Sequence, residues 1–357
     1  MTRQHVQRIL AASLLALGGL QPVAMASDNS ESDAHAGLMS WSFDYHDTAV
    51  SVDIWYPSST PARAIPAGPF SLHAASNGEW LPASEHAGQY PLLIISHGTG
   101  GSSIAHHRIA ESLAKTGYLV AAIEHPGDNY QDRSLVANKQ YFDERPRQLQ
   151  ALMAALASDP AISARIDPSR VGAIGHSAGG YSVAALLGAN PDRDALIAHC
   201  AKQNDDPSCG YADPSVGVTT PTDMPFQLPP EADSAVAHPT LTIQSAALLA
   251  PLGSVVSASS RISAEIDVLI MDAEQDAILP SQYHADRIHK SAPHAHRTTA
   301  KGAGHFSFIS PVVAAWAESL GEVAEDPTGF DRDQFNTHVS QTLQAWFDST
   351  LKHTANR

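Results

Sequence analysis

A serine flanked by glycines and other small residues lies at positions 175–179, where the chain reads GHSAG. This stretch matches G-x-S-x-G, a pattern in which a serine occupies a tight turn between a strand and a helix. An apolar segment precedes it, and the helix-compatible segment AGGYSVAALLGA follows. Glycines two positions to either side give the backbone room for such a turn. We therefore predict that Ser177 is a nucleophile; the alternative is that these small residues only pack a helix on a strand.

A serine hydroxyl attacks a carbonyl only if a base takes its proton and a third group orients that base. When the serine comes first along the chain, the acid and then the base follow in loops after later strands. Asp276 follows the apolar run at 267–273, and His305 lies in the glycine-bounded segment TTAKGAGHFSFI. Asp272 and Glu274 are the competing acids, but one falls within the expected strand and the other at its exit.

The chain has 19 histidines, so the alternatives to His305 need an interpretation. Those nearest to it are expected on a helix or its polar exit, as solvated surface residues: His284, His289, His294 and His296. His176 should point away from Ser177 and act as a packing or hydrogen-bonding neighbour. His125 either lines the site or is a strand-end histidine bonded to a loop.

Backbone amides are a common means of stabilising the negative charge that develops during acyl transfer. The glycine-rich segment ISHGTGGSS, at 95–103, follows an apolar run and is the natural source of one such amide, that of Thr99. The Ala178 amide, beside the nucleophile at the start of a helix, is the other. A phosphate-binding loop is the alternative, but the segment matches neither G-x-G-x-x-G nor the lysine-bearing P-loop pattern.

The segments around these candidates alternate between two kinds of pattern. Nearly continuous apolar runs, typical of strands buried on both faces, span 91–96, 118–124, 170–175, 241–250 and 267–273. Helical spacing is found at 104–116, 142–158, 178–188 and 282–290, and an apolar stripe from Phe335 to Leu351 predicts a last helix covering the sheet. This alternation predicts an α/β fold with a mostly parallel sheet and helices on both faces.

Three regions depart from the alternation. Residues 41–57 alternate apolar and polar side chains and predict an antiparallel strand pair. Residues 57–89 are rich in Pro, Ser, Ala and Gly and are predicted as a long surface connection. Residues 189–239 are rich in proline and acidic residues and lack periodicity. We interpret 27–357 as one domain in which about 189–239 is a cap insertion.

The N-terminal segment has the features of a secretion signal. Arg3 and Arg8 precede an apolar run from Ile9 to Leu20, and Ala24-Met25-Ala26 fits the small-x-small pattern of a cleavage site. The apolar run is shorter than the roughly 20 residues that span a bilayer. We predict cleavage after residue 26 and export to the periplasm or the medium, without stable membrane insertion.

The charge balance restricts the partners. The chain carries 21 Lys and Arg against 37 Asp and Glu, a formal charge of −16, and removing residues 1–26 makes it more negative still. Such a surface repels phosphate backbones, so nucleic acid is not expected as a partner. The sequence does not indicate an oligomeric state.

The two cysteines, Cys200 and Cys209, lie close together in the insertion. In an exported protein this favours a local disulfide over a metal site, which would need more ligands. Two free thiols are the alternative.

Several of these stretches together resemble the α/β-hydrolase superfamily, and within it the dienelactone-hydrolase-like group that includes platelet-activating factor acetylhydrolase-type esterases. The stretches are DIWYPSS, PLLIISHGTGG, YLVAAIEHPGDN, VGAIGHSAGG, VLIMDAEQDAILP and GAGHFSF. The resemblance implies Ser177 as nucleophile, Asp276 as acid, His305 as base, and the Thr99 and Ala178 amides as the oxyanion hole. It implies no cofactor and no metal. Dienelactone hydrolases proper use a cysteine where this chain has Ser177, which favours ordinary carboxylic esters as substrates.

The sequence thus predicts an exported serine esterase that cleaves small-molecule esters, of short or medium chain length, through an acyl-enzyme. An amidase or peptidase with the same three residues is one alternative. A non-catalytic binding protein on a hydrolase scaffold is the other.

Overall fold

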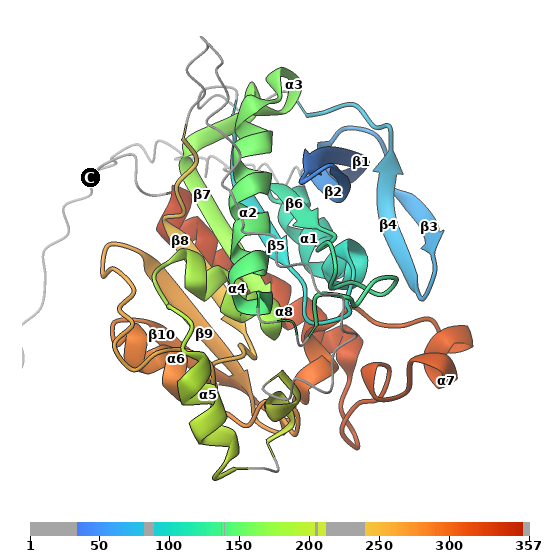
Figure 1. Cartoon of the computed structure of the whole chain (residues 1–357). Helices are drawn as coiled ribbons and strands as arrows, with labels where there is room; N and C mark the ends of the chain where they lie inside the picture. Colours follow the sequence, from blue (N-terminus) through green and yellow to red (C-terminus); the bar gives the residue numbers. More distant parts are fainter. Residues whose placement is uncertain are drawn as a thin grey trace, which may run out of the picture. The chain divides into compact units, whose positions relative to one another are not determined.

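A ten-stranded sheet forms the centre of the described part of this computed structural model, which comprises residues 34–81, 89–136, 138, 140–203, 206–211 and 240–352 (Figure 1). The strands are β1 (His35–Tyr45), β2 (Thr48–Ser58), β3 (Arg63–Ala67), β4 (Phe70–Ser76), β5 (Tyr90–Ser96), β6 (Leu119–Ile123), β7 (Ile166–His176), β8 (Ser245–Leu249), β9 (Asp267–Ala273) and β10 (His296–Ala300). Their order across the sheet is β10-β9-β8-β7-β5-β6-β2-β1-β4-β3.

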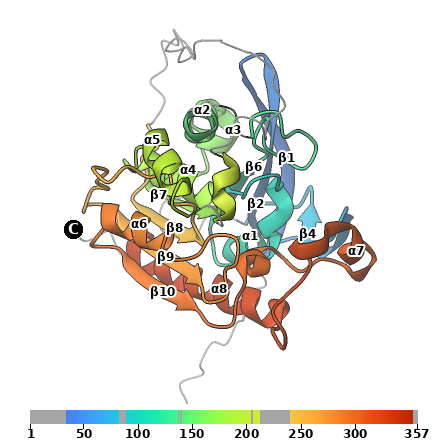
Figure 2. The ribbon, with the colours of Figure 1, turned by 60° about the horizontal axis from the view of Figure 1, so that its bottom comes forward.

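The six strands from β5 to β10 are mutually parallel. Their carboxyl ends therefore lie along one edge of the sheet, and loops that follow them can meet there. β7, which leads into the predicted nucleophile, lies between β5 and β8 near the middle of the sheet (Figure 2).

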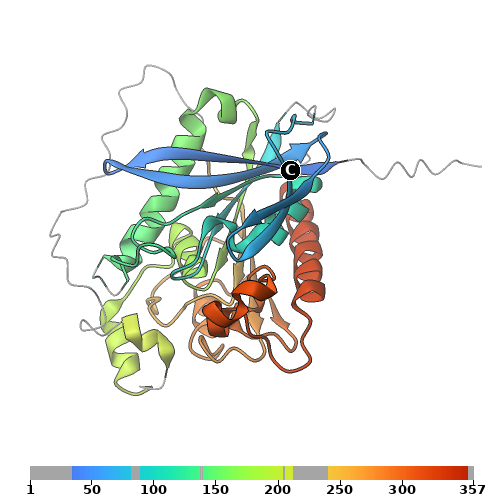
Figure 3. The same cartoon turned by 90° about the vertical axis from the view of Figure 1, so that its right-hand side faces the viewer.

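Helices cover both faces of this sheet. They are α1 (His107–Lys115), α2 (Tyr141–Ser158), α3 (Pro160–Ser163), α4 (Ala178–Leu186), α5 (Arg193–Cys200), α6 (Ala285–Ser291), α7 (Ala317–Leu320) and α8 (Arg332–Phe347). On one face α2, α4 and α6 pack against side chains such as Leu92 and Ile94, and on the other α1 and α8 pack against Leu93 and Ile95 (Figure 3). Successive strand residues point to opposite faces, which is why the apolar runs are continuous, and the predicted α/β class is confirmed.

The prediction for residues 57–89 is wrong in part. β3 and β4 form an antiparallel hairpin there, and β4 adds to β1 through a short parallel contact. The turn between them uses Gly68 at φ +57°, a backbone conformation that suits glycine. The sequence pattern did not predict β4, because most of its residues are small or polar and only Phe70 and Leu72 supply large buried side chains.

The described part of the insertion consists of α5 and a 3-10 turn at Pro207–Tyr211. Cys200, the last residue of α5, forms a disulfide with Cys209 in that turn, as predicted. Residues 212–239 and the expected signal segment, 1–26, lie outside the described residues. Residues Ala34–Arg357 group into one compact unit. In the parts of the chain that are described, no helix has the length and hydropathy needed to cross a bilayer.

Candidate active site

Ser177 lies on the sharp turn that joins β7 to α4. Its backbone has φ 58° and ψ −121°, a conformation that costs a non-glycine residue on the order of 1–3 kcal/mol. The flanking glycines make this turn sterically possible: a Cβ on Gly175 would lie 2.2 Å from the Gly179 carbonyl oxygen, and a Cβ on Gly179 would lie 2.0 Å from that of Ser96. The small residues therefore allow the β7–α4 turn to pack directly on the end of β5.

Ser177, His305 and Asp276 form a chain of two hydrogen bonds, one between Ser177 and His305 and one between His305 and Asp276. His305 follows β10, and its Nε2 lies 2.9 Å from Ser177 Oγ. Its Nδ1 lies 2.8 Å from Asp276 Oδ2, in the loop after β9. Because a carboxylate only accepts, Nδ1 donates to Asp276, and Nε2 of the neutral ring is free to accept the serine proton. All three side chains are buried: Ser177 is 9% exposed, His305 is 4% exposed, and the Asp276 side chain is 3% exposed.

The Asp276 carboxylate is oriented by its own loop. Its second oxygen accepts from the backbone amides of Ile278 at 2.9 Å and Leu279 at 2.7 Å. The competing acids bind elsewhere: Asp272 accepts from Arg297 and Thr299, and Glu274 from Lys301. Of the acids considered, the structure brings only Asp276 to His305.

His176 supports the position of His305. Its Nε2 donates to the His305 carbonyl oxygen at 3.0 Å, and the two rings lie 5.1 Å apart. Burial, followed by the neighbouring His305, holds the pKa of His176 well below its usual value, so the ring is neutral. His176 is thus the hydrogen-bonding neighbour that the sequence suggested.

The prediction for His284 is wrong. His284, expected on the solvated surface, is 1% exposed and immediately precedes α6. Its Nδ1 accepts from the amides of Gly253 and Ser254, and its Nε2 lies 3.3 Å from the buried Asp206 carboxylate. Burial would raise the pKa of Asp206, but the hydrogen bonds from His284 and His199 outweigh it and hold that pKa well below normal. This contact connects the insertion to the core.

The glycine-rich loop after β5 lies against the nucleophile. A Cβ on Gly98 would lie 3.1 Å from the Cβ of Ser177 and 3.5 Å from its Oγ. Thr99 follows directly, and its hydroxyl lies 2.6 Å from that of Tyr141. Ala178 is the first residue of α4, so its amide has no acceptor within the helix.

His125 does not line an open site. It is fully buried, with Nε2 2.8 Å from Ser96 Oγ and Nδ1 2.7 Å from Gln148 Oε1. It is therefore the strand-end histidine bonded to its surroundings, the second of the two interpretations.

Sequence reasoning missed a buried ion pair near this loop. Asp128 and Arg145, both with fully buried side chains, contact each other directly behind residues 97–101. The sequence signal for this ion pair was weak, because Asp128 is typical of a turn and Arg145 is typical of the exposed face of a helix.

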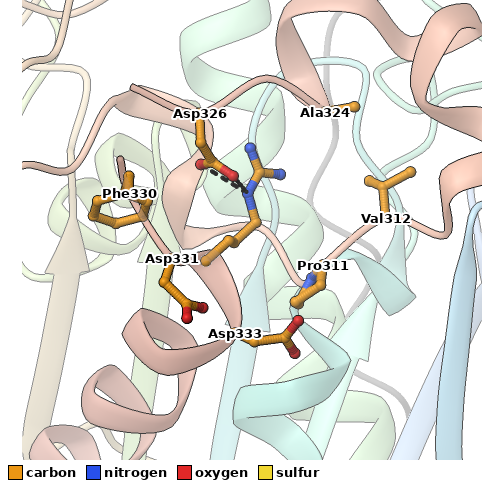
Figure 4. Close-up of a pocket in the computed structure, with 8 residues that line it drawn as sticks. Pro311, Val312, Ala324, Asp326, Phe330, Asp331 and Asp333 are labelled. Atoms are coloured by element: carbon orange, nitrogen blue, oxygen red, sulfur yellow. Dashed lines mark hydrogen bonds and ion pairs between the residues drawn. The ribbon is translucent and has the colours of Figure 1, made fainter. Parts of the chain in front are cut away.

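A separate hollow of about 390 Å³ lies between the segment after His305 and the start of α8 (Figure 4). Its charged residues already have partners: Arg332 pairs with Asp326, Asp333 pairs with Arg108, and Asp331 accepts from the Gln334 amide. Within the described residues, no group of three or more His, Cys, Asp or Glu side chains is arranged to hold a metal ion. This hollow does not include Ser177, Asp276 or His305.

Comparison with known proteins gives two similarities. A family model for platelet-activating factor acetylhydrolase, isoform II, matches residues 66–157, a range that includes the loop at 97–101 and ends before Ser177. No curated protein matches the chain. Among solved structures, a ferulic acid esterase from Streptomyces cinnamoneus is similar with a TM-score of 0.56 and 17% identity over 92% of each chain.

Both similarities are to ester-cleaving enzymes, which agrees with the enzyme class and the resemblance predicted from the sequence. With this sheet order and this structural likeness, the chain has the α/β-hydrolase fold.

Proposed function

We propose that this protein is a serine hydrolase of carboxylic esters in which Ser177, His305 and Asp276 act together. The observation that carries the proposal is the series of hydrogen bonds from Ser177 Oγ through the His305 ring to the Asp276 carboxylate. The strained backbone at Ser177 supports it, because such conformations persist only where the surrounding structure enforces them.

In the proposed reaction, Ser177 Oγ attacks the ester carbonyl carbon while His305 Nε2 takes the hydroxyl proton. Asp276 keeps the Nδ1 proton in place and stabilises the positive charge on the ring. The tetrahedral intermediate then collapses: the ester C–O bond breaks, and the Nε2 proton passes to the leaving alcohol. Water, deprotonated by the same nitrogen, releases the acid from the acyl-enzyme and restores the serine.

The amides of Thr99 and Ala178 are the proposed donors to the oxygen that becomes negative. Ala178 begins α4, so its amide is unpaired within the helix and carries the positive end of the helix dipole. Gly98 packs against Ser177 and Thr99 is the next residue, which supports the same role for the Thr99 amide. These donors, and no cofactor, would supply the charge stabilisation.

The substrate and location form the finer part of the proposal. We propose short or medium chain esters, and export to the periplasm or the medium after cleavage at residue 26. The Cys200–Cys209 disulfide is compatible with an oxidising compartment. The insertion that contains it would act as a cap that shapes the acyl or alcohol pocket.

A panel of p-nitrophenyl esters graded in acyl length, run on wild type and on Ser177→Ala, tests the reaction. We expect turnover of the shorter esters by wild type, and loss of at least about 10³-fold in kcat for the variant. A matched anilide series separates an esterase from an amidase.

A fluorophosphonate probe should label wild type at Ser177 only. Absence of both labelling and turnover in folded wild type would refute the proposal and favour a binding protein.

A further inference from the structure

The loop at 97–101 has a glycine-rich backbone that needs hydrogen bonds to hold it in one conformation. Three of its five residues are glycines, and Gly100 has φ +65°. A glycine-rich segment loses more conformational entropy on ordering than other sequences do. An oxyanion donor, however, must be held within hydrogen-bonding distance of an oxygen that becomes charged only during the reaction. Hydrogen bonds within the loop and to groups outside it must therefore hold it in place.

The Asp128 carboxylate is one such group. One oxygen accepts from the Gly100 amide at 2.7 Å, and the other accepts from the Tyr141 hydroxyl at 2.8 Å. The same Tyr141 hydroxyl lies 2.6 Å from the Thr99 hydroxyl. Tyr141 thus bridges the side chain of the proposed oxyanion residue to a fully buried carboxylate.

The Arg145 guanidinium extends this arrangement to α4. It contacts Asp128 and donates to the His97 carbonyl oxygen at the start of the loop. Its Nε lies 3.1 Å from Ser182 Oγ, which in turn donates to the Ala178 carbonyl oxygen at 2.9 Å. One buried cation is therefore bonded both to the loop and, through Ser182, to the first turn of α4.

His97 fixes the peptide unit that carries the Thr99 amide. Its Nδ1 donates to the Gly98 carbonyl oxygen at 2.7 Å, and the Gly101 amide donates to the same oxygen at 3.0 Å. The His125 amide donates to the other ring nitrogen, so the ring is neutral with its proton on Nδ1. Burial, followed by the nearby Arg145 charge, lowers the pKa of His97 to about 3, which agrees with this form.

The Gly98 carbonyl and the Thr99 N–H belong to one peptide group. Two hydrogen bonds to the carbonyl hold the plane of that group and polarise its N–H, because linked hydrogen bonds strengthen one another. A buried ion pair is itself weak evidence for added stability, since desolvation offsets much of its attraction. The hydrogen bonds of this ion pair to residues 97 and 100 indicate that it also holds the loop in place.

We infer that Asp128, Arg145, Tyr141 and His97 are positioning residues, which hold the loop at 97–101 so that the Thr99 amide faces the developing oxyanion. The inference rests on the proposed function. In this inference the buried network contributes to stabilising the transition state of the reaction. A purely structural network would contribute only to the stability of the fold.

Tyr141→Phe is the sharpest test, because it keeps the buried ring and removes only the hydroxyl shared by Asp128 and Thr99. Tyr118→Phe is the matched control, since that tyrosine is also fully buried and its hydroxyl donates to a carboxylate, Asp348, at 2.7 Å. We expect Y141F to lose about 10- to 100-fold in kcat with little change in KM, in line with the loss of one oxyanion contact or less. Y118F should lower Tm similarly and leave kcat unchanged.

A second readout separates positioning from stability. The affinity of a trifluoromethyl ketone, which forms an oxyanion on Ser177, should weaken in Y141F by the same factor as kcat/KM. If Y141F does not fold, Thr99→Val removes the other half of the same hydrogen bond and keeps the backbone amide, and it should show the same parallel loss.

The outcomes are distinguishable. Active wild type with unchanged kcat/KM and inhibitor affinity in folded Y141F or T99V overturns this inference alone and leaves the proposed function standing. A wild type that neither turns over esters nor reacts with fluorophosphonate overturns the proposed function, and this inference with it. A loss of Tm without a loss of kcat/KM assigns the network to stability only and also refutes the inference.

Discussion

His106 should make the protein sensitive to mild acid. This histidine ends the 3-10 turn at 103–106, is 1% exposed, and packs against the ring of His176 at 5.1 Å. Neither of its ring nitrogens has a hydrogen-bond partner among the described residues. Burial, followed by the neighbouring His107, lowers the pKa of His106 from 6.5 to about 4. The folded protein therefore holds this ring neutral.

The direction of the pH effect follows from proton uptake. Between pH 6.5 and 4 the unfolded chain binds a proton at His106 that the folded chain does not, so stability falls as the pH falls through this window. Integrating from pH 7.5 to pH 5 with a folded pKa of about 4 gives a loss of about 2 kcal/mol from this one residue. For a chain of this size that is a shift of about 3 °C in Tm.

His106→Leu removes this contribution at nearly constant volume. At pH 7.5 we expect a Tm equal to or above that of wild type, because the change removes unpaired buried polar atoms. Between pH 7.5 and pH 5 the Tm advantage of the variant should widen by about 3 °C, measured by thermal unfolding in matched buffers. His338→Leu, at an exposed position on α8, is the control and should follow wild type. Parallel Tm curves for wild type and H106L would refute the reasoning.

Three further predictions follow from the site and the insertion. Gly179→Ala should destabilise the fold by more than about 3 kcal/mol in denaturant unfolding, because its Cβ would lie 2.0 Å from the Ser96 carbonyl oxygen. Asp276→Asn should lower kcat by about 10³- to 10⁴-fold in ester hydrolysis, because His305 loses its orienting carboxylate. Reducing the Cys200–Cys209 disulfide should change the ratio of activity on bulky and small esters more than it changes the circular dichroism of the core.

Each of these has a matched comparison. Gly304→Ala meets its nearest atom at an ordinary 3.4 Å and should leave stability near wild type; equal costs for the two glycines would contradict the steric argument. Asp272→Asn, which loses contacts to Arg297 but none to His305, should lower Tm and preserve kcat. For the disulfide, an unchanged preference after reduction would argue against the cap.

The parallel strands could be predicted from sequence because each is covered on both faces. Most of each strand from β5 to β9 is therefore a nearly continuous apolar run, and the order of these runs with the intervening helices implies the topology. β10, with the sequence HRTTA, has no such signal, since its side chains are largely exposed. The β3–β4 hairpin was missed for a similar reason.

The candidate catalytic residues were predictable because each follows a strand at the expected end of the sheet. The groups that hold them were not. Asp128 and Arg145 form their pair across 17 residues, and Asp206 meets His284 across 78. Such contacts depend on how distant segments pack, and no local spacing reports them. In the sequence alone, a charged residue that is buried in an ion pair cannot be told apart from one on the surface.

The proposed base follows an edge strand of the sheet. Among the described strands β10 pairs with β9 alone and forms one edge of the sheet, whereas β7, which leads into Ser177, has strands on both sides. Partial fraying of that edge during heating would carry His305 away while the interior strands and their helices stay intact. Catalytic competence would then disappear at a lower temperature than helical content, so spectroscopic melting would overstate the working range of the enzyme.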